Sequence, residues 1–138
     1  MNIVEISFNF SINFLSLIRK IASMIDLTQS QVLCIYAIPF NGISQSNLAK
    51  KLSIDISTLS RNLDRLIQLN LVYKQSSLID KRSFKILLTE KGDILYQKFN
   101  FIINDRLASS YNKLELNEQE SLEEILNKLN WELELINK

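Results

Sequence analysis

The stretch ISQSNLAKKLSIDISTLSRNLDRLIQLNLVYKQSSLIDKRSFKILLTEKG, Ile43 to Gly92, carries the densest set of structural signals in the chain. Ser44 precedes a short amphipathic segment and Asp55 precedes a longer one, and serine and aspartate are both favoured helix N-caps. Asn70 ends the second segment, since asparagine tolerates the left-handed conformation that helix exits often need. The stretch therefore predicts two short helices joined by a tight turn.

Two segments rich in apolar and β-favouring residues, LVYKQSS and FKILL, follow the second helix. The residues between them, 78–83, include one acid and two bases, which predicts a β-hairpin with a charged loop. Thr89 then marks the start of a further helix. Helix, tight turn, helix and hairpin, in this order, form the winged arrangement that docks on duplex DNA.

Helical periodicity continues on both sides of this unit. An N-terminal apolar stripe predicts an amphipathic helix that stops before Leu27, and the capping box of Thr28 and Gln31 predicts a second helix that ends around residues 39–42. A capping box at Asn117 and Glu120 predicts the last helix. The two stripes consist of Phe10, Phe14, Ile18, Ile21 and Ile25, and of Leu122, Ile125, Leu126, Leu129, Leu133 and Ile136.

Composition limits the classes of function. With 138 residues, of which 46% are hydrophobic, the chain fits one globular domain. One cysteine and no histidine leave little material for an internal disulfide, a transition-metal site or a catalytic Cys/His or Ser/His pair. Two glycines do not suffice for a glycine-rich phosphate loop. We therefore expect a protein that is not an enzyme and uses no cofactor or metal.

No apolar run approaches the length of a membrane span, and Glu5 stands where a secretory signal would carry positive charge. A cytoplasmic location without membrane association is expected. The net charge of +1 gives no global sign of a nucleic-acid partner, so any such signal has to be local.

The second helix of the central pair supplies that local signal. At about 100° per residue, Leu59, Leu63, Leu66 and Ile67 fall on one side, and Arg61 falls almost opposite them. Hydroxyl side chains near the start of this outward face can contact phosphates or bases, and an arginine can bind guanine O6 and N7 together.

These residues resemble the winged helix-turn-helix of the MarR family of bacterial transcription regulators. The resemblance covers Ile43 to Gly92 and rests on QSNLAKKL, TLSRNLDRL, the Asp80–Arg82 wing and LTEKG. It implies a mainly α fold with a small β-wing, in which one domain, 1–138, holds a winged helix-turn-helix at 28–92. Helices at 1–27 and 93–138 would form the dimerisation part. The family's usual glycine after the recognition helix is Asn70 here.

The resemblance also implies that Arg82 enters the minor groove, and Asp80 is positioned to hold its guanidinium. Lys74, Lys81 and Lys85 are expected to neutralise phosphates. The full expected DNA-contacting set is Ser44, Gln45, Ser57, Thr58, Ser60, Arg61, Asn62, Arg65, Lys74, Asp80, Lys81, Arg82 and Lys85.

A homodimer is expected, because one helix-turn-helix contacts few base pairs and two-fold dimers on pseudo-palindromic operators are the common solution. The apolar stripes at both ends could instead be core faces of a single domain; the resemblance favours the dimer. Its expected interface includes Phe10, Phe14, Leu129, Trp131, Leu133 and Ile136.

The family commonly responds to a small aromatic or phenolic effector, bound between the DNA-binding and dimerisation parts, or to cysteine oxidation. Cys34 is the candidate redox or ligand-pocket residue, but its apolar neighbours and lack of a local cation favour a buried structural thiol. The sequence thus predicts a homodimeric repressor released from DNA by an effector. The alternative is a winged-helix module for protein contacts, in which Arg61 and Arg82 are only surface charges.

Overall fold

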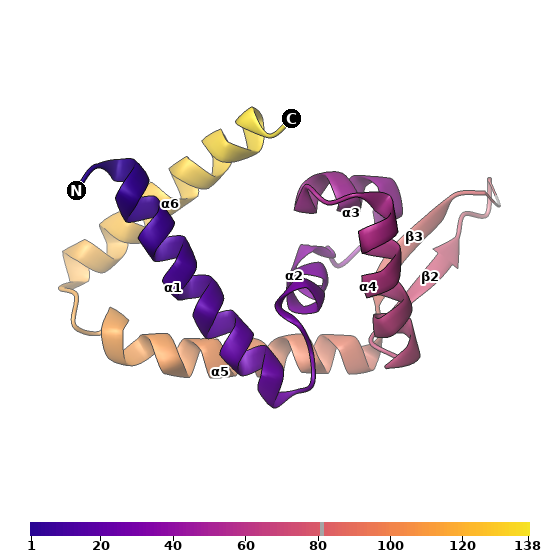
Figure 1. Cartoon of the computed structure of the whole chain (residues 1–138), viewed down its shortest axis with the longest axis horizontal. Helices are drawn as coiled ribbons and strands as arrows, with labels where there is room; N and C mark the ends of the chain where they lie inside the picture. The colour runs from indigo at the N-terminus through magenta and orange to yellow at the C-terminus, as the bar shows by residue number, and fades with distance from the viewer. Residues whose placement is uncertain (81) are drawn as a thin grey trace. The chain divides into compact units, whose positions relative to one another are not determined.

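The computed structural model describes residues 1–80 and 82–138, and the chain divides into two compact units, Met1–Ile102 and Ile103–Lys138. Among these residues no helix combines the length and the apolar character needed to cross a bilayer. The elements, in chain order, are α1 (Ile3–Met24), α2 (Gln29–Ala37), β1 (Ile43–Ser44), α3 (Gln45–Leu52), α4 (Ile56–Gln68), β2 (Val72–Ser76), β3 (Phe84–Leu88), α5 (Glu90–Tyr111) and α6 (Leu116–Ile136) (Figure 1). The predicted fold class, mainly helical with a small β-wing, is confirmed.

The capping box predicted for α2 is present. The Gln31 backbone N–H donates to Thr28 Oγ1 over 3.2 Å, and the Thr28 N–H donates to Gln31 Oε1 over 3.0 Å. The helix ends at Ala37, somewhat earlier than predicted. Ile38 takes an extended conformation (φ −83°, ψ 114°) because the ring of Pro39 disfavours a helical residue before it.

The two central helices begin and end at the predicted signals. Ser44 caps α3, since its Oγ accepts from the Asn47 backbone N–H over 3.1 Å. Asp55 occupies the N-cap position of α4. Asn70 adopts φ +59°, so asparagine takes the left-handed exit conformation as predicted.

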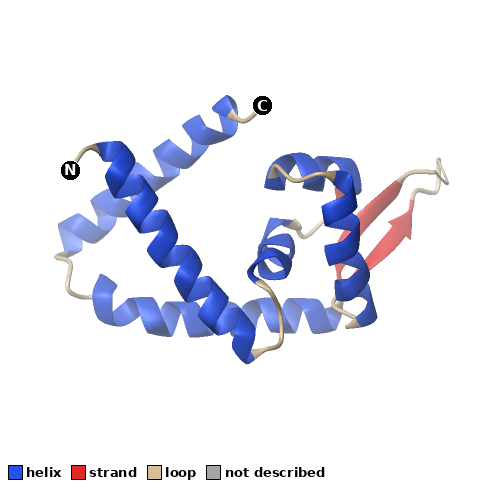
Figure 2. Cartoon of the chain, viewed as in Figure 1, coloured by secondary structure: helices blue, strands red, loops and turns tan. Residues whose placement is uncertain are grey.

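The predicted hairpin forms β2 and β3, which pair antiparallel from Val72 opposite Leu88 to Ser76 opposite Phe84. The strands are red in Figure 2. A third strand, β1, was not predicted: it pairs with β3 and gives a sheet of order β1-β3-β2. Two residues are too short for any periodic pattern, and one of them is also the Ser44 cap of α3.

The core of the first unit lies where the C-terminal part of α1 meets α2, α3, α4 and the sheet. Leu59, Leu63 and Leu66 of α4 are fully buried, as the helical wheel predicted. Ile67, predicted on the same side, is 38% exposed, because it lies at the edge of the stripe in the last turn of α4. The other fully enclosed large side chains are Ile21, Cys34, Leu48, Val72 and Ile86.

The start of α5 is fastened to the end of α4. Thr89 Oγ1 accepts from the Gly92 backbone N–H over 2.9 Å and donates to the Asn70 carbonyl over 2.6 Å. A Cβ on Gly92 would lie 2.0 Å from the Leu71 carbonyl oxygen, so only glycine fits. The end of α4 and the start of α5 are therefore held closely together.

In the second unit, the prediction that Asn117 and Glu120 cap α6 is wrong by two residues. The helix starts at Leu116, and the Glu115 backbone N–H donates to Glu118 Oε1 over 3.0 Å. The Gln119 side chain donates to the carbonyls of Tyr111 and Leu114, each over 3.1 Å, which tightens the preceding turn and moves the cap upstream. No residue of α6 is buried.

Candidate nucleic-acid interface

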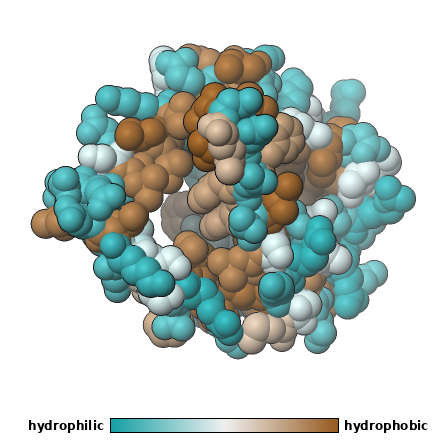
Figure 3. Space-filling model, turned by 60° about the vertical axis from the view of Figure 1, so that its left-hand side comes forward, coloured by the Kyte–Doolittle hydropathy of each residue, from teal (hydrophilic) through white to brown (hydrophobic). Residues whose placement is uncertain are grey.

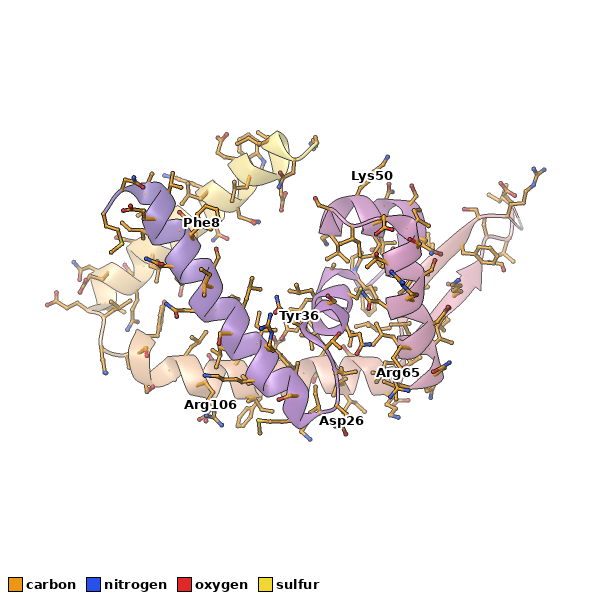
Figure 4. All side chains as sticks on the ribbon, in the orientation of Figure 1. Phe8, Asp26, Tyr36, Lys50, Arg65 and Arg106 are labelled. Carbon is orange, nitrogen blue, oxygen red and sulfur yellow. The ribbon has the colours of Figure 1, made fainter. Side chains whose placement is uncertain are left out.

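The outer face of α4 is open and polar. Ser57, Arg61 and Arg65 are exposed, on the side away from the buried leucines, and Thr58 is half-buried. Figure 4 labels Arg65 on this helix. The structure therefore places the predicted arginines and hydroxyl residues on one accessible surface.

Asp55 organises the N-terminal end of this face. The hydroxyls of Ser57 and Thr58 both donate to its carboxylate. Arg61 Nη2 in turn donates to Thr58 Oγ1 over 3.5 Å. The hydroxyl of Ser57, and then that of Thr58, hold the pKa of Asp55 below its usual range, so the carboxylate is ionised at neutral pH.

Asp55 was not among the predicted site residues. The sequence indicated only a helix cap, but the carboxylate accepts from side-chain hydroxyls and makes no cap bond to the backbone. The signal was present in the spacing, because serine two residues and threonine three residues after an N-cap aspartate both reach its carboxylate. Gln45 and Ser60, predicted as separate contacts, are joined by a 2.8 Å bond from Gln45 Nε2 to Ser60 Oγ.

Asn62, which was in the expected DNA-contacting set, turns inward instead. Its Nδ2 is buried with no hydrogen-bond partner of acceptable geometry among the described residues, although the amide lies beside the Cys34 thiol. Asn62 is three residues after the buried Leu59 and four before the buried Leu66, so it shares a side of α4 with these leucines. Its amide is not available to DNA in this conformation.

Cys34 is fully buried in α2. Burial raises the pKa of its thiol to about 11, and the neighbouring Asn62 amide opposes this only in part. A thiol in this environment stays protonated and weakly nucleophilic at neutral pH.

The wing tip is shaped by its own hydrogen bonds. Ser77 Oγ accepts from the backbone N–H groups of Ile79 and Asp80, over 3.2 and 3.4 Å. Asp80 Oδ1 accepts from the Arg82 backbone N–H over 3.0 Å, so the predicted contact between these residues exists but its donor is not the guanidinium. An aspartate readily accepts from the amide two residues ahead, which fixes the turn and leaves the arginine side chain exposed. Lys81 lies outside the described residues.

Lys74 and Lys85 lie on opposite faces of the sheet. Lys74 pairs with Ile86, and Lys85 pairs with Gln75. Since paired residues share a face and successive residues alternate, the two lysines diverge. The structure does not bring them to one surface.

A groove of about 710 Å³ lies within the first unit, between the end of α2, the base of the hairpin and the start of α5. Tyr36 packs there against Tyr96, with ring centroids 4.7 Å apart, and donates to Asn100 Oδ1. Figure 4 labels Tyr36. Burial, followed by the neighbouring Tyr96, raises the pKa of Tyr36 to about 12, so its phenol is neutral at physiological pH. The groove is lined by Tyr36, Ile38, Pro39, Phe40, Tyr73, Leu87, Leu88, Thr89, Glu90, Asp93 and Tyr96.

The terminal helices expose apolar side chains, and hydrophobic patches are open on the face drawn in Figure 3. On α1, Phe10 is 59% exposed and stacks on the half-buried Phe14 at 5.9 Å. On α6, Leu133 is 55% exposed. Trp131 is nine residues after Leu122, so at about 100° per residue it lies on the opposite side of α6 from the leucine and isoleucine stripe. The predicted interface residues of α6 therefore do not form one face.

Comparison with known proteins bears on both the site and the fold. A sequence model described as the MarR family matches residues 27–84. Wild-type MarR from E. coli, in the apo form, is 24% identical with a TM-score of 0.80, over 94% of this chain and 96% of that chain. The transcriptional regulator SlyA is 20% identical with a TM-score of 0.80, over 99% and 97%.

A complex of S. aureus MepR with DNA is 24% identical with a TM-score of 0.73, over 96% of this chain and 98% of that chain. The structural likenesses establish the fold along almost the whole chain, and the family match covers α2 through to the start of β3. Residues 27–84 match the MarR family, and the chain has the winged helix-turn-helix fold of the MarR, SlyA and MepR structures.

Proposed function

We propose that this protein is a cytoplasmic homodimeric repressor that binds a pseudo-palindromic duplex through residues 28–92 and is released by a small effector. The observation that carries the proposal is the outer face of α4, where Arg61 and two hydroxyl residues stand free of the core beside a hairpin that presents Arg82. The solved complex of the structurally similar MepR with DNA supports the same use of the fold.

In this proposal α4 enters the major groove and Arg61 binds a guanine through O6 and N7. The wing lies along the adjacent minor groove, where Arg82 meets the negative potential of A·T-rich sequence. Arg65, Lys74, Lys81 and Lys85 contact phosphates, which fix the position of the protein without selecting a sequence. Lys74 and Lys85 point from different faces of the wing, so they would contact different phosphates.

Dimerisation is proposed through the helices at 1–27 and 93–138. The exposed apolar side chains of α1 and α6 are what a second copy would cover, because large apolar patches on soluble proteins mark interaction surfaces. Two recognition helices related by a two-fold axis would then contact equivalent half-sites.

The effector is proposed to bind in the groove between α2, the hairpin base and α5. Its four aromatic side chains suit an aromatic or phenolic ligand, and pockets for small molecules are commonly lined in this way. Glu90 and Asp93 also line the groove, so an uncharged phenol is favoured over a carboxylate-bearing ligand. A ligand there would contact Tyr73 and Leu87 of the wing, which gives it a means to displace the wing from DNA.

Selection of bound duplexes from a random pool, followed by titration of the selected site at several salt concentrations, tests the proposal. A salt-dependent preference for a two-fold symmetric sequence is expected, with log affinity falling by about 0.9 per phosphate contact for each decade of salt. Weak binding without sequence preference would favour the alternative of a module for protein contacts.

A further inference from the structure

We propose that Asp55 turns the N-terminal end of α4 into a hydrogen-bond acceptor surface, which selects a base with an amino group in the major groove: cytosine or adenine. The inference rests on the proposed function, in which α4 enters that groove. It assigns a role to a residue whose position had indicated only a helix cap.

The acceptor cluster consists of Asp55, Ser57 and Thr58, and the positions of its protons decide which hydrogen bonds it can make. An ionised carboxylate only accepts hydrogen bonds, and each hydroxyl has a single hydrogen to donate. Ser57 and Thr58 both direct that hydrogen to Asp55. The two hydroxyl oxygens therefore present lone pairs outward, and the carboxylate, which is fully exposed, adds its own. Three neighbouring groups accept and none donates.

The bases differ in what they offer to such a surface. In the major groove, cytosine N4 and adenine N6 are donors, whereas guanine N7 and O6 and thymine O4 are acceptors. A guanine or thymine opposite the cluster would leave acceptors facing acceptors. The free N–H groups of a helix N-terminus would ordinarily favour a phosphate, but the negative charge of Asp55 repels one. The cluster is therefore suited to contact base edges and not the phosphates of the DNA backbone.

Arg61 lies beside this cluster and has the opposite character. Its guanidinium only donates, and Nη2 contacts Thr58 Oγ1 at 3.5 Å. The outer face of α4 thus places a donor group next to an acceptor group. A G·C pair presents guanine acceptors and a cytosine donor along one major-groove edge, which matches this pairing.

The test compares the wild-type protein with Asp55→Ser on duplexes that carry each of the four bases at each half-site position. Serine is as good an N-cap as aspartate, so the helix should be retained, but its single, shorter hydroxyl lacks the two carboxylate oxygens that accept from Ser57 and Thr58. At one position in each half-site the wild type should prefer cytosine or adenine. The variant should lose at least about fivefold of that preference, the lower end of the effect of one mismatched base pair. Its affinity for unrelated duplexes should rise, because a negative charge near the phosphates is removed.

Asp55→Asn provides a second variant, because its amide keeps the shape of aspartate but can also donate. Preference at the same position should shift towards guanine or thymine. Thr58→Val, which removes one of the acceptors, should weaken the preference without that shift.

Equal weakening of all duplexes by Asp55→Ser, with a lower melting temperature, would reduce Asp55 to a helix cap and overturn the inference. An unchanged base preference in Asp55→Ser, alongside a loss of binding in Arg61→Ala, would overturn the inference and leave the proposed function standing. No salt-dependent duplex binding by the wild type would overturn both.

Discussion

The helices α4 and α6 have similar apolar periodicity but lie in opposite environments. Leu59, Leu63 and Leu66 of α4 are each fully buried by the rest of the first unit. No side chain of α6 is buried, and Leu129 and Leu133 remain more than half exposed. The apolar side of α4 is satisfied within one chain, which frees its polar side to bind. The apolar side of α6 stays exposed, and in the proposed function a second copy covers it.

The largest effect should follow from placing a charge on the exposed stripe of α6. Leu133→Glu is expected to raise the dimer dissociation constant by roughly 1000-fold, because burying an unpaired charge costs several kcal/mol. Sedimentation at micromolar concentration should then show monomers. Asn127→Glu is the matched control, since it adds the same charge to the polar side of the same helix and should leave a dimer.

A Leu133→Glu protein that remains dimeric would show that the stripe does not form the interface. Trp131 supplies the complementary test, because it lies on the other side of α6. Should Trp131→Glu dissociate the dimer and Leu133→Glu leave it intact, the interface lies on the tryptophan side.

The next largest effect should be on stability, through the buried leucines of α4. Leu63→Ala should lower the free energy of unfolding by about 2–5 kcal/mol, because the leucine is fully buried and its loss leaves a cavity. The neighbouring exposed residue gives the control: Asp64→Ala should change stability by less than about 0.5 kcal/mol. Urea unfolding of both variants measures the difference. A small effect of Leu63→Ala would mean that α4 is not held by its own chain, and the contrast with α6 would fail.

The parts of the fold that were predicted correctly are those fixed by local chemistry. Thr28, Ser44 and Asn70 act through side chains and backbone angles within a few residues, so their roles are visible in the sequence. The buried leucines of α4 follow from helical geometry alone. What the sequence did not show was non-local: strand β1 depends on its pairing with β3, and the early cap of α6 depends on Gln119 bonds to the preceding turn.

The candidate site follows the same division. Helical geometry placed Arg61 and Arg65 outward correctly. Asn62, which was in the expected DNA-contacting set, instead has its amide beside Cys34 of another helix, and the divergence of Lys74 and Lys85 depends on strand pairing. Asp55 was missed because it was interpreted only as a helix cap, although its spacing to Ser57 and Thr58 allows both hydroxyls to reach its carboxylate.

A smaller effect, on DNA affinity, should distinguish the proposed contacts of Arg61 and Arg82. Arg61→Ala should cost about 1–3 kcal/mol on the preferred site and relax the preference at one base position per half-site. Arg82→Ala should weaken binding chiefly on duplexes with A·T-rich flanks, where a narrow minor groove attracts arginine. Duplexes varied separately at half-site and flank distinguish the two. Equal losses on every duplex would show that neither arginine contributes to sequence preference.

The smallest effect is expected at Cys34, which is buried in α2 next to the amide of Asn62 on α4. With a thiol pKa of about 11, roughly one thiol in ten thousand is ionised at pH 7, so peroxide and disulfide reagents should react slowly with the folded protein. Cys34→Ala should lower stability by about 1 kcal/mol and leave DNA affinity unchanged. The measurement is DNA binding by both proteins before and after peroxide treatment, with thiol labelling in urea as the control for reactivity. A different result would be that peroxide weakens DNA binding by the wild type but not by Cys34→Ala. Oxidant would then reach the buried thiol when the first unit opens, and the buried side of α4, against which Cys34 lies, would have a regulatory role as well as a structural one.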